Sequence, residues 1–171
     1  MEALLEALGM LIRGERETWW TVGTSLGFSA WSTLASSLPG IPLGVLLFMY
    51  RFRGKRAVIA TVNAVMAIPT VVVGLFVYSL ISRSGPLGSL NLLYAPGGVI
   101  AGQALLALPL VIAMTYTGLQ KLDARYLETL VTLGAKPFRR MLAMMREGRL
   151  VLIQAVLAAF GRVTGEVGVS M

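Results

Sequence analysis

Long uncharged runs alternate with short basic segments along this chain. The first run, residues 18–50, has 33 positions without a charged side chain, and the second, residues 57–82, has 26. A third run covers residues 98–120, and a fourth, which contains two charged residues, begins at residue 150. About 20 predominantly apolar residues suffice for a helix to cross a bilayer. Each run therefore predicts a membrane-spanning helix.

Prolines interrupt the pattern inside two of these runs. Pro39 and Pro42 fall within the first, where we expect a span near residues 22–49 with a kink, and Pro69 lies mid-way along the second. A proline removes one backbone hydrogen bond, which a helix bundle tolerates when neighbours satisfy the freed carbonyl. Two interpretations of Pro69 remain: an ordinary packing kink, or a bend that exposes a carbonyl to a path through the membrane.

The connecting segments have patterns of their own. Residues 1–13 repeat leucine at helical spacing, which predicts a helix at the membrane interface or on the bundle rather than a signal peptide. Residues 83–97 contain three glycines and two prolines and predict an external loop, with apolar residues that could dip into the membrane.

Composition supports an all-α integral membrane protein built as a bundle of transmembrane helices. The chain is 56% hydrophobic and 13% charged, with a mean hydropathy of +0.76, whereas soluble domains carry roughly 25% charged residues. It has no cysteine and no histidine. Their absence excludes disulfides, thiol catalysis and cysteine metal sites, and it removes the usual general base.

The net charge of +7 is unevenly placed. Residues 51–56 hold four of the fifteen basic residues and residues 121–149 hold seven. Basic residues at the ends of spans favour the cytosolic side, so we expect both segments in the cytosol and the amino terminus outside. The first three predicted spans lie between the amino terminus and residues 121–149, and an odd number of crossings puts these two parts on opposite sides of the membrane. The same distribution argues against a nucleic-acid partner.

Residues 121–149 predict a cytosolic helix-turn-helix. Asp123 can cap the first helix, Gly134 can end it, and Pro137 fits the first turn of the second. Apolar residues at helical spacing predict one apolar face on each helix. These residues are Leu127, Leu130 and Val131 on the first helix, and Phe138, Met141, Leu142 and Met145 on the second. The alternatives are that the two helices grip a partner, or that they lie on the membrane or on the protein itself.

Arg162 and Glu166 stand four residues apart inside the fourth run, so one helix would place them on the same side. A charge at membrane depth costs about 3 kcal/mol on insertion scales, and pairing lowers that cost. Either the two residues form an ion pair that locks helices, or they line a path or its gate. Glycines 161, 165 and 168 would allow close helix approach.

The first helix of the pair resembles the cytosolic loop motif of binding-protein-dependent ABC importer permeases. The usual form is Glu-Ala-Ala, three residues, then Gly. This chain keeps Glu128 and Gly134 at that spacing but has Thr129 and Leu130 in place of the alanines, and it has Glu147 where many members have proline.

Three further stretches, residues 66–75, 82–88 and 161–168, are similar to the tungstate-uptake branch of that family, close to the molybdate and sulfate permeases. The resemblance extends from about residue 20 onward and implies one permease domain over residues 1–171. Family members continue with more spanning helix, so we expect a protein truncated at its carboxyl end.

The resemblance also implies partners and sites. It implies a homodimer with a second permease copy, a cytosolic ATPase dimer, an extracytoplasmic binding protein, and the cell membrane of a prokaryote. ATP and magnesium would belong to the ATPase, because this sequence has no phosphate-binding loop and is expected to bind no cofactor. The implied ATPase contacts are Glu128, Thr129, Leu130, Leu133, Gly134, Ala135 and Phe138. The candidates for a path or gate are Pro69, Thr70, Gln103, Arg162 and Glu166, although a glutamine such as Gln103 more often makes a helix-helix hydrogen bond.

Three other functions compete with an oxyanion importer. One is a permease of the same architecture for another solute. A second is a membrane enzyme, which the missing histidine and cysteine disfavour, as does Glu166 being the one acidic residue in an apolar run. A third is an assembly subunit that anchors another protein without transport.

Overall fold

The computed structural model describes residues 16–90 and 95–167, and all regular elements in those ranges are helical. Helices α2 (Arg16–Met49) and α5 (Pro96–Leu119) are long and apolar enough to cross a membrane. At 1.5 Å per residue the shorter of them reaches about 36 Å, against a hydrocarbon core of about 30 Å. The predicted all-α membrane fold is confirmed. The helix predicted for residues 1–13 lies outside the described residues.

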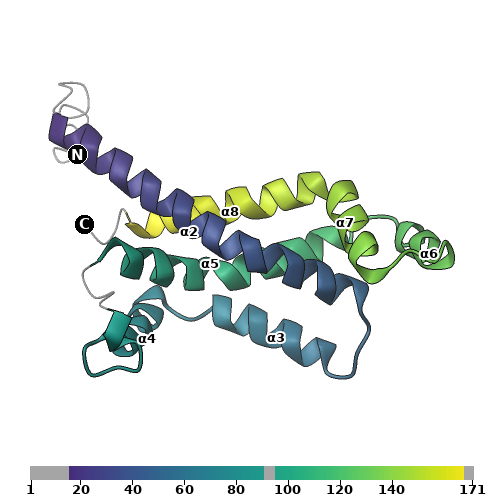
Figure 1. Ribbon diagram of the computed structural model, residues 1–171, viewed down its shortest axis with the longest axis horizontal. Coiled ribbons are helices and arrows are strands. Elements are labelled where there is room, and N and C mark those ends of the chain that lie inside the picture. Colours follow the sequence, from purple (N-terminus) through teal and green to yellow (C-terminus); the bar gives the residue numbers. More distant parts are fainter. Residues whose placement is uncertain (1–15, 91–94, 168–171) are drawn as a thin grey trace.

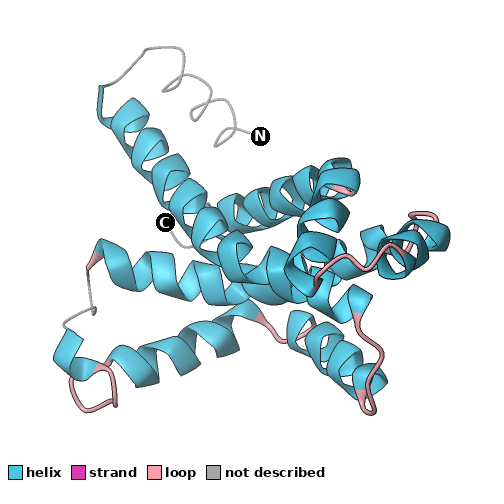
Figure 2. Cartoon of the chain, turned by 45° about the vertical axis from the view of Figure 1, so that its right-hand side comes forward, coloured by secondary structure: helices cyan, strands magenta, loops and turns pink. Residues whose placement is uncertain are grey.

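The prolines act differently in the two runs. Pro39 and Pro42 lie inside α2, which continues through them as one helix. At Pro69 the second run divides into α3 (Lys55–Met66) and α4 (Thr70–Ile81), which are bent by 97°. Figure 2 shows the two helices joined by a loop. The bend is confirmed, but the single bent helix is corrected to two twelve-residue helices, each only about 18 Å long and too short to cross alone.

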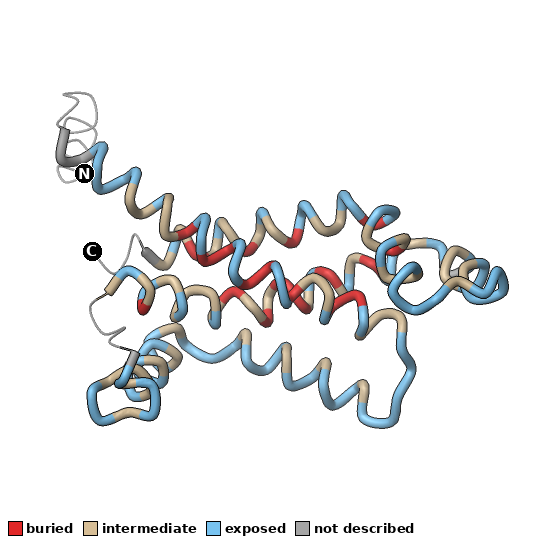
Figure 3. Tube along the Cα trace, viewed as in Figure 1, coloured by how far each residue is buried: buried red, intermediate tan, exposed pale blue. Residues whose placement is uncertain are grey.

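Helix α5 lies at the centre of the bundle, between α2 and α8 (Arg149–Val167) on one side and α3 on the other (Figure 1). A core cluster joins α5 to α8 through Ala107, Val111, Ala159 and Val163. Most buried positions lie on α2, α5 and α8, whereas neither α3 nor α4 has a buried residue (Figure 3). The packed core is therefore a three-helix unit, with α3 and α4 against its outer side.

Helices α2 and α5 run parallel and approach closely. Ser32 donates a hydrogen bond from its Oγ to Oε1 of Gln103 at 2.7 Å. Further along, Gly40 faces Val111 and Gly44 faces Thr115. A Cβ atom added at Gly44 would lie only 2.6 Å from the Cβ of Thr115. The close approach therefore depends on glycine at that position.

The two basic segments lie at one end of the molecule. The short helices α6 (Ala124–Thr132) and α7 (Pro137–Glu147) stand beside the turn from α2 to α3, away from the start of α2 and the end of α8 (Figure 1). The 3₁₀ helix η1 (Gly88–Leu90) follows α4 at the opposite end. This arrangement agrees with the prediction that residues 51–56 and 121–149 share one side of the membrane.

Candidate functional site

Helices α6 and α7 begin where the sequence predicts. The Oδ1 atom of Asp123 accepts a hydrogen bond from the backbone N–H of Arg125 at 3.0 Å, which satisfies an amide left unpaired at the start of α6. Pro137 is the first residue of α7, where its missing N–H leaves no hydrogen bond unmade. Both predicted helix starts are confirmed.

The turn between them is fixed by backbone hydrogen bonds. Gly134 has a φ of 71°, in the left-handed region that glycine adopts without strain. Its N–H donates to the carbonyl of Val131 at 3.0 Å, and the N–H of Ala135 donates to that of Leu130 at 3.1 Å. This is the Schellman arrangement that ends helices. Arg140 also donates from Nε to the carbonyl of Ala135, so the turn is tied to α7 as well as to α6.

The helix pair is attached to two spanning helices at once. Met144 of α7 is only 1% exposed and forms a core cluster with Val45 of α2 and Leu119 of α5. Leu127, Leu130, Met141 and Met145 pack against that cluster from α6 and α7. A displacement of α7 would therefore reach α2 and α5 together.

The packed face of α7 differs from the predicted one. Met141 and Met145 pack inward as expected, but the buried residue between them is Met144. Phe138 is 69% exposed and Leu142 is exposed, so these two residues of the predicted apolar face do not pack against the rest of the described chain. The stripe is rotated because α7 must meet α2 and α5 together, which the spacing along one helix does not reveal.

Four apolar side chains of the pair are consequently exposed: Val131, Leu133, Phe138 and Leu142. We call them the exposed apolar set. Glu128 and Thr129 are exposed as well, with the Thr129 hydroxyl donating to the carbonyl of Arg125 at 2.8 Å. Large apolar side chains exposed together are typical of a surface that binds another protein or a membrane.

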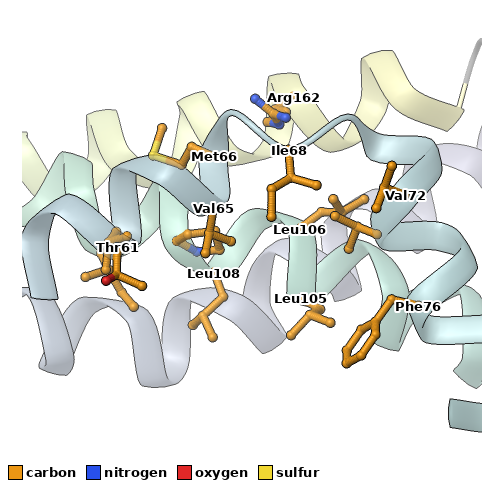
Figure 4. Close-up of a pocket in the computed structure, with 14 residues that line it drawn as sticks. Thr61, Val65, Met66, Ile68, Val72, Phe76, Leu105, Leu106, Leu108 and Arg162 are labelled. Atoms are coloured by element: carbon orange, nitrogen blue, oxygen red, sulfur yellow. The ribbon is translucent and has the colours of Figure 1, made fainter.

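A cavity of about 520 Å³ lies where α3 and α4 meet α5 (Figure 4). The side chains around it are apolar apart from Thr61 and Arg162. Ile68, in the break between α3 and α4, and Val72 of α4 both line it. Pro69 and Thr70 lie between these two residues in the chain, but neither lines the cavity.

Arg162 and Glu166 meet within α8. The Nε of Arg162 lies 4.0 Å from Oε1 of Glu166, and about a third of each side chain is exposed. That distance is too long for a hydrogen bond, and the buried Nε atom has no hydrogen-bond partner in the described structure. The prediction that Gly161 and Gly165 allow close helix contact is wrong for the described chain, since a Cβ at either would meet nothing within 4 Å. Gly168 lies outside the described residues.

Gln103 makes the helix-helix hydrogen bond that is usual for a membrane glutamine, accepting from Ser32. It is not among the residues that line the cavity. Among the predicted path residues, Arg162 alone lines the cavity, whereas Gln103 belongs to a packed contact. Sequence reasoning missed the α2 side of that contact, although a signal was present: small residues recur every fourth position at Ser32, Ser36, Gly40 and Gly44.

Comparison with known proteins identifies the family. The family model described as "Binding-protein-dependent transport system inner membrane component" matches residues 40–169. The tungstate uptake system permease protein of Campylobacter jejuni is 36% identical over 97% of this chain and 70% of its own length. The corresponding protein of Peptoclostridium acidaminophilum is 33% identical over 99% of this chain and 75% of its length.

A more distant relative is the sulfate transport system permease protein of Salmonella typhimurium, 30% identical over 75% of this chain and 49% of its own length. The family match covers both the helix pair α6–α7 and the helices α5 and α8 that position the cavity. With the apolar spans, these similarities establish that the chain belongs to the membrane permeases of binding-protein-dependent ABC transport systems.

Proposed function

We propose that this permease forms the membrane path of an importer for a tetrahedral oxyanion, with tungstate as the substrate. The observation that carries the proposal is the similarity, over nearly the whole chain, to two permeases named for tungstate uptake. A sulfate permease is related over three quarters of the chain, which supports the oxyanion class more broadly. Molybdate and sulfate are the alternative substrates.

The energy source is a separate ATPase dimer that docks on α6 and α7 from the cytosol. The exposed apolar set and the neighbouring Glu128 offer it a surface. ATP and magnesium belong to that partner, because this chain has no phosphate-binding loop. ATP-driven movement of α7 passes through Met144 to Val45 and Leu119, and so to the inner ends of α2 and α5.

The remaining partners complete the importer. A second copy of the permease forms the other half of the path, and an extracytoplasmic binding protein delivers the oxyanion. The assembly lies in the inner or plasma membrane of a prokaryote, with residues 51–56 and 121–149 in the cytosol, where positive charge is favoured. The proposed path or gate residues are Pro69, Thr70, Arg162 and Glu166, of which Arg162 lines the cavity.

Uptake of labelled tungstate by cells that lack their own permease tests the substrate. We expect uptake that depends on this chain and on its binding protein, with molybdate and sulfate as weaker competitors. Uptake of an amino acid or a sugar, with no effect on tungstate, would overturn the proposal.

Docking of the ATPase is tested with Phe138→Ala, which removes the exposed aromatic side chain of α7. We expect less ATPase to co-purify with the permease, because exposed aromatic anchors dominate many protein interfaces. The matched control is Leu157→Ala, which removes a similarly exposed apolar residue from α8, at 63% against 69%. Equal co-purification in the two variants would place the docking surface elsewhere.

A further inference from the structure

One cation lies at the edge of an otherwise apolar cavity. Of the fourteen described residues that line the space between α3, α4 and α5, Arg162 alone carries a charge and twelve are apolar. A multiply charged oxyanion that entered such a space would lose water that apolar side chains cannot replace. Arg162 is the one lining group whose charge can offset that loss.

Arg162 is only loosely held by its neighbour. The 4.0 Å from its Nε to Glu166 is at the outer limit of an ion pair, and the buried Nε has no hydrogen-bond partner in the described residues. A guanidinium group carries five N–H donors in a planar fork that fits two oxygens of an oxyanion at once. The arginine can therefore bind a tetrahedral anion while Glu166 remains on the next turn of α8.

The position of Arg162 also fits a path through the membrane. It lies thirteen residues into α8, about 20 Å from the start of that helix at the basic end of the molecule. Figure 4 shows it beside Ile68, at the break between α3 and α4. The single lining charge thus lies beside the point where the second predicted span is interrupted and bent by 97°.

We propose that Arg162 binds the oxyanion as it crosses the membrane centre and that Glu166 holds the guanidinium group when the anion is absent. This inference rests on the proposed oxyanion transport and adds the residue that recognises the anion. Exchange of Glu166 for the anion on the guanidinium group lowers the cost of bringing a tetrahedral oxyanion into the apolar cavity.

Two double variants separate anion binding from a structural ion pair. R162Q/E166Q removes both charges together, and R162E/E166R exchanges them along α8. Both are measured as tungstate uptake into proteoliposomes that contain the complete transporter with its ATPase and binding protein. We expect both to lower uptake by about tenfold or more, since hydrogen bonds to a charged group contribute about 1.5–3 kcal/mol. A purely structural pair would survive the exchange, so wild-type uptake by R162E/E166R would overturn the proposal.

The conservative variant R162K keeps the charge but loses the planar fork. We expect its uptake to lie between those of the wild type and R162Q/E166Q. The amount of assembled transporter in each preparation shows whether a variant folds. If the wild type carries no oxyanion, the proposed function itself fails. If the wild type carries tungstate and R162Q/E166Q matches it within about twofold, this inference alone fails.

A bulky side chain tests whether the cavity is on the path. Val65 and Val58 lie two turns apart on α3 and are both 40% exposed, but only Val65 lines the cavity. We expect Val65→Trp to slow tungstate uptake by about tenfold and Val58→Trp to leave it unchanged, because only the first indole ring fills the cavity. Equal uptake by the two tryptophan variants would show that the anion crosses elsewhere.

Discussion

Helix α5 meets its neighbours in two different ways. Toward α2 it packs on small residues, and Gly44 allows Thr115 to approach the backbone directly. Toward α3 and α4 it faces large apolar side chains, yet a cavity of about 520 Å³ remains between them. Small residues at a regular spacing thus produce the closer contact, while bulky residues on a broken helix leave space unfilled. Helices α2 and α5 belong to one packed unit, against which α3 and α4 lie more loosely.

The largest expected effect comes from filling the closest contact of the packed side. Gly44→Leu places its Cβ 2.6 Å from the Cβ of Thr115, so α2 and α5 must separate. We expect the free energy of unfolding to fall by about 3 kcal/mol or more, as in overpacked cores. Unfolding of the purified transporter by SDS in mixed micelles measures it. Gly74→Leu on α4 is the control, because a Cβ there would meet nothing within 4 Å. Equal losses of unfolding free energy in the two variants would show that α5 packs no more closely against α2 than against α4.

A smaller loss in the free energy of unfolding is expected from truncating the side chain that joins α7 to the packed unit. Met144→Ala removes a residue that is 1% exposed and packs against Val45 and Leu119. We expect a loss of about 2 kcal/mol, the low end of the range for truncating a buried methionine to alanine. The control is Leu75→Ala on α4, where the side chain is 64% exposed. An unchanged midpoint of SDS unfolding for Met144→Ala would mean that α7 is not packed as described.

The smallest expected effect comes from one polar contact. Ser32→Ala removes the hydrogen bond to Gln103, and hydrogen bonds between membrane helices contribute about 0.6 kcal/mol on average. We expect the free energy of unfolding to fall by that amount. The control is Ser79→Ala on α4, because the Ser79 hydroxyl bonds to the carbonyl of Phe76 in its own helix. A double-mutant cycle with Gln103→Ala isolates the pair. A coupling energy of zero would leave the glycines as the source of the close contact.

Local signals in the sequence were sufficient for the ends of α6 and α7. Asp123, Gly134 and Pro137 act through their own backbone and nearest neighbours, so their roles do not depend on the rest of the fold. Pro69 likewise indicated the bend. The size of the bend was not predictable, because the packing of α3 and α4 against α5 determines it.

Other features depend on residues far apart in the chain. Phe138 and Met144 are both apolar residues of one helix, and only the positions of α2 and α5 decide which is buried. The cavity beside Arg162 combines four helices, so no spacing within one of them could indicate it. The glycines of α2 were recognisable as small, but their partners on α5 were not.

The partners across the α2–α5 contact keep a constant offset. Ser32 and Gln103 are 71 positions apart, and so are Gly40 and Val111, and Gly44 and Thr115. A deletion of one residue within either helix would turn the side chains beyond it by about 100°, which would move large groups opposite the glycines. Changes of length in the segment between Ser82 and Ala95 would leave every one of these pairs intact. Tolerance to insertions and deletions should therefore differ sharply between that connection and the two helices it helps to join.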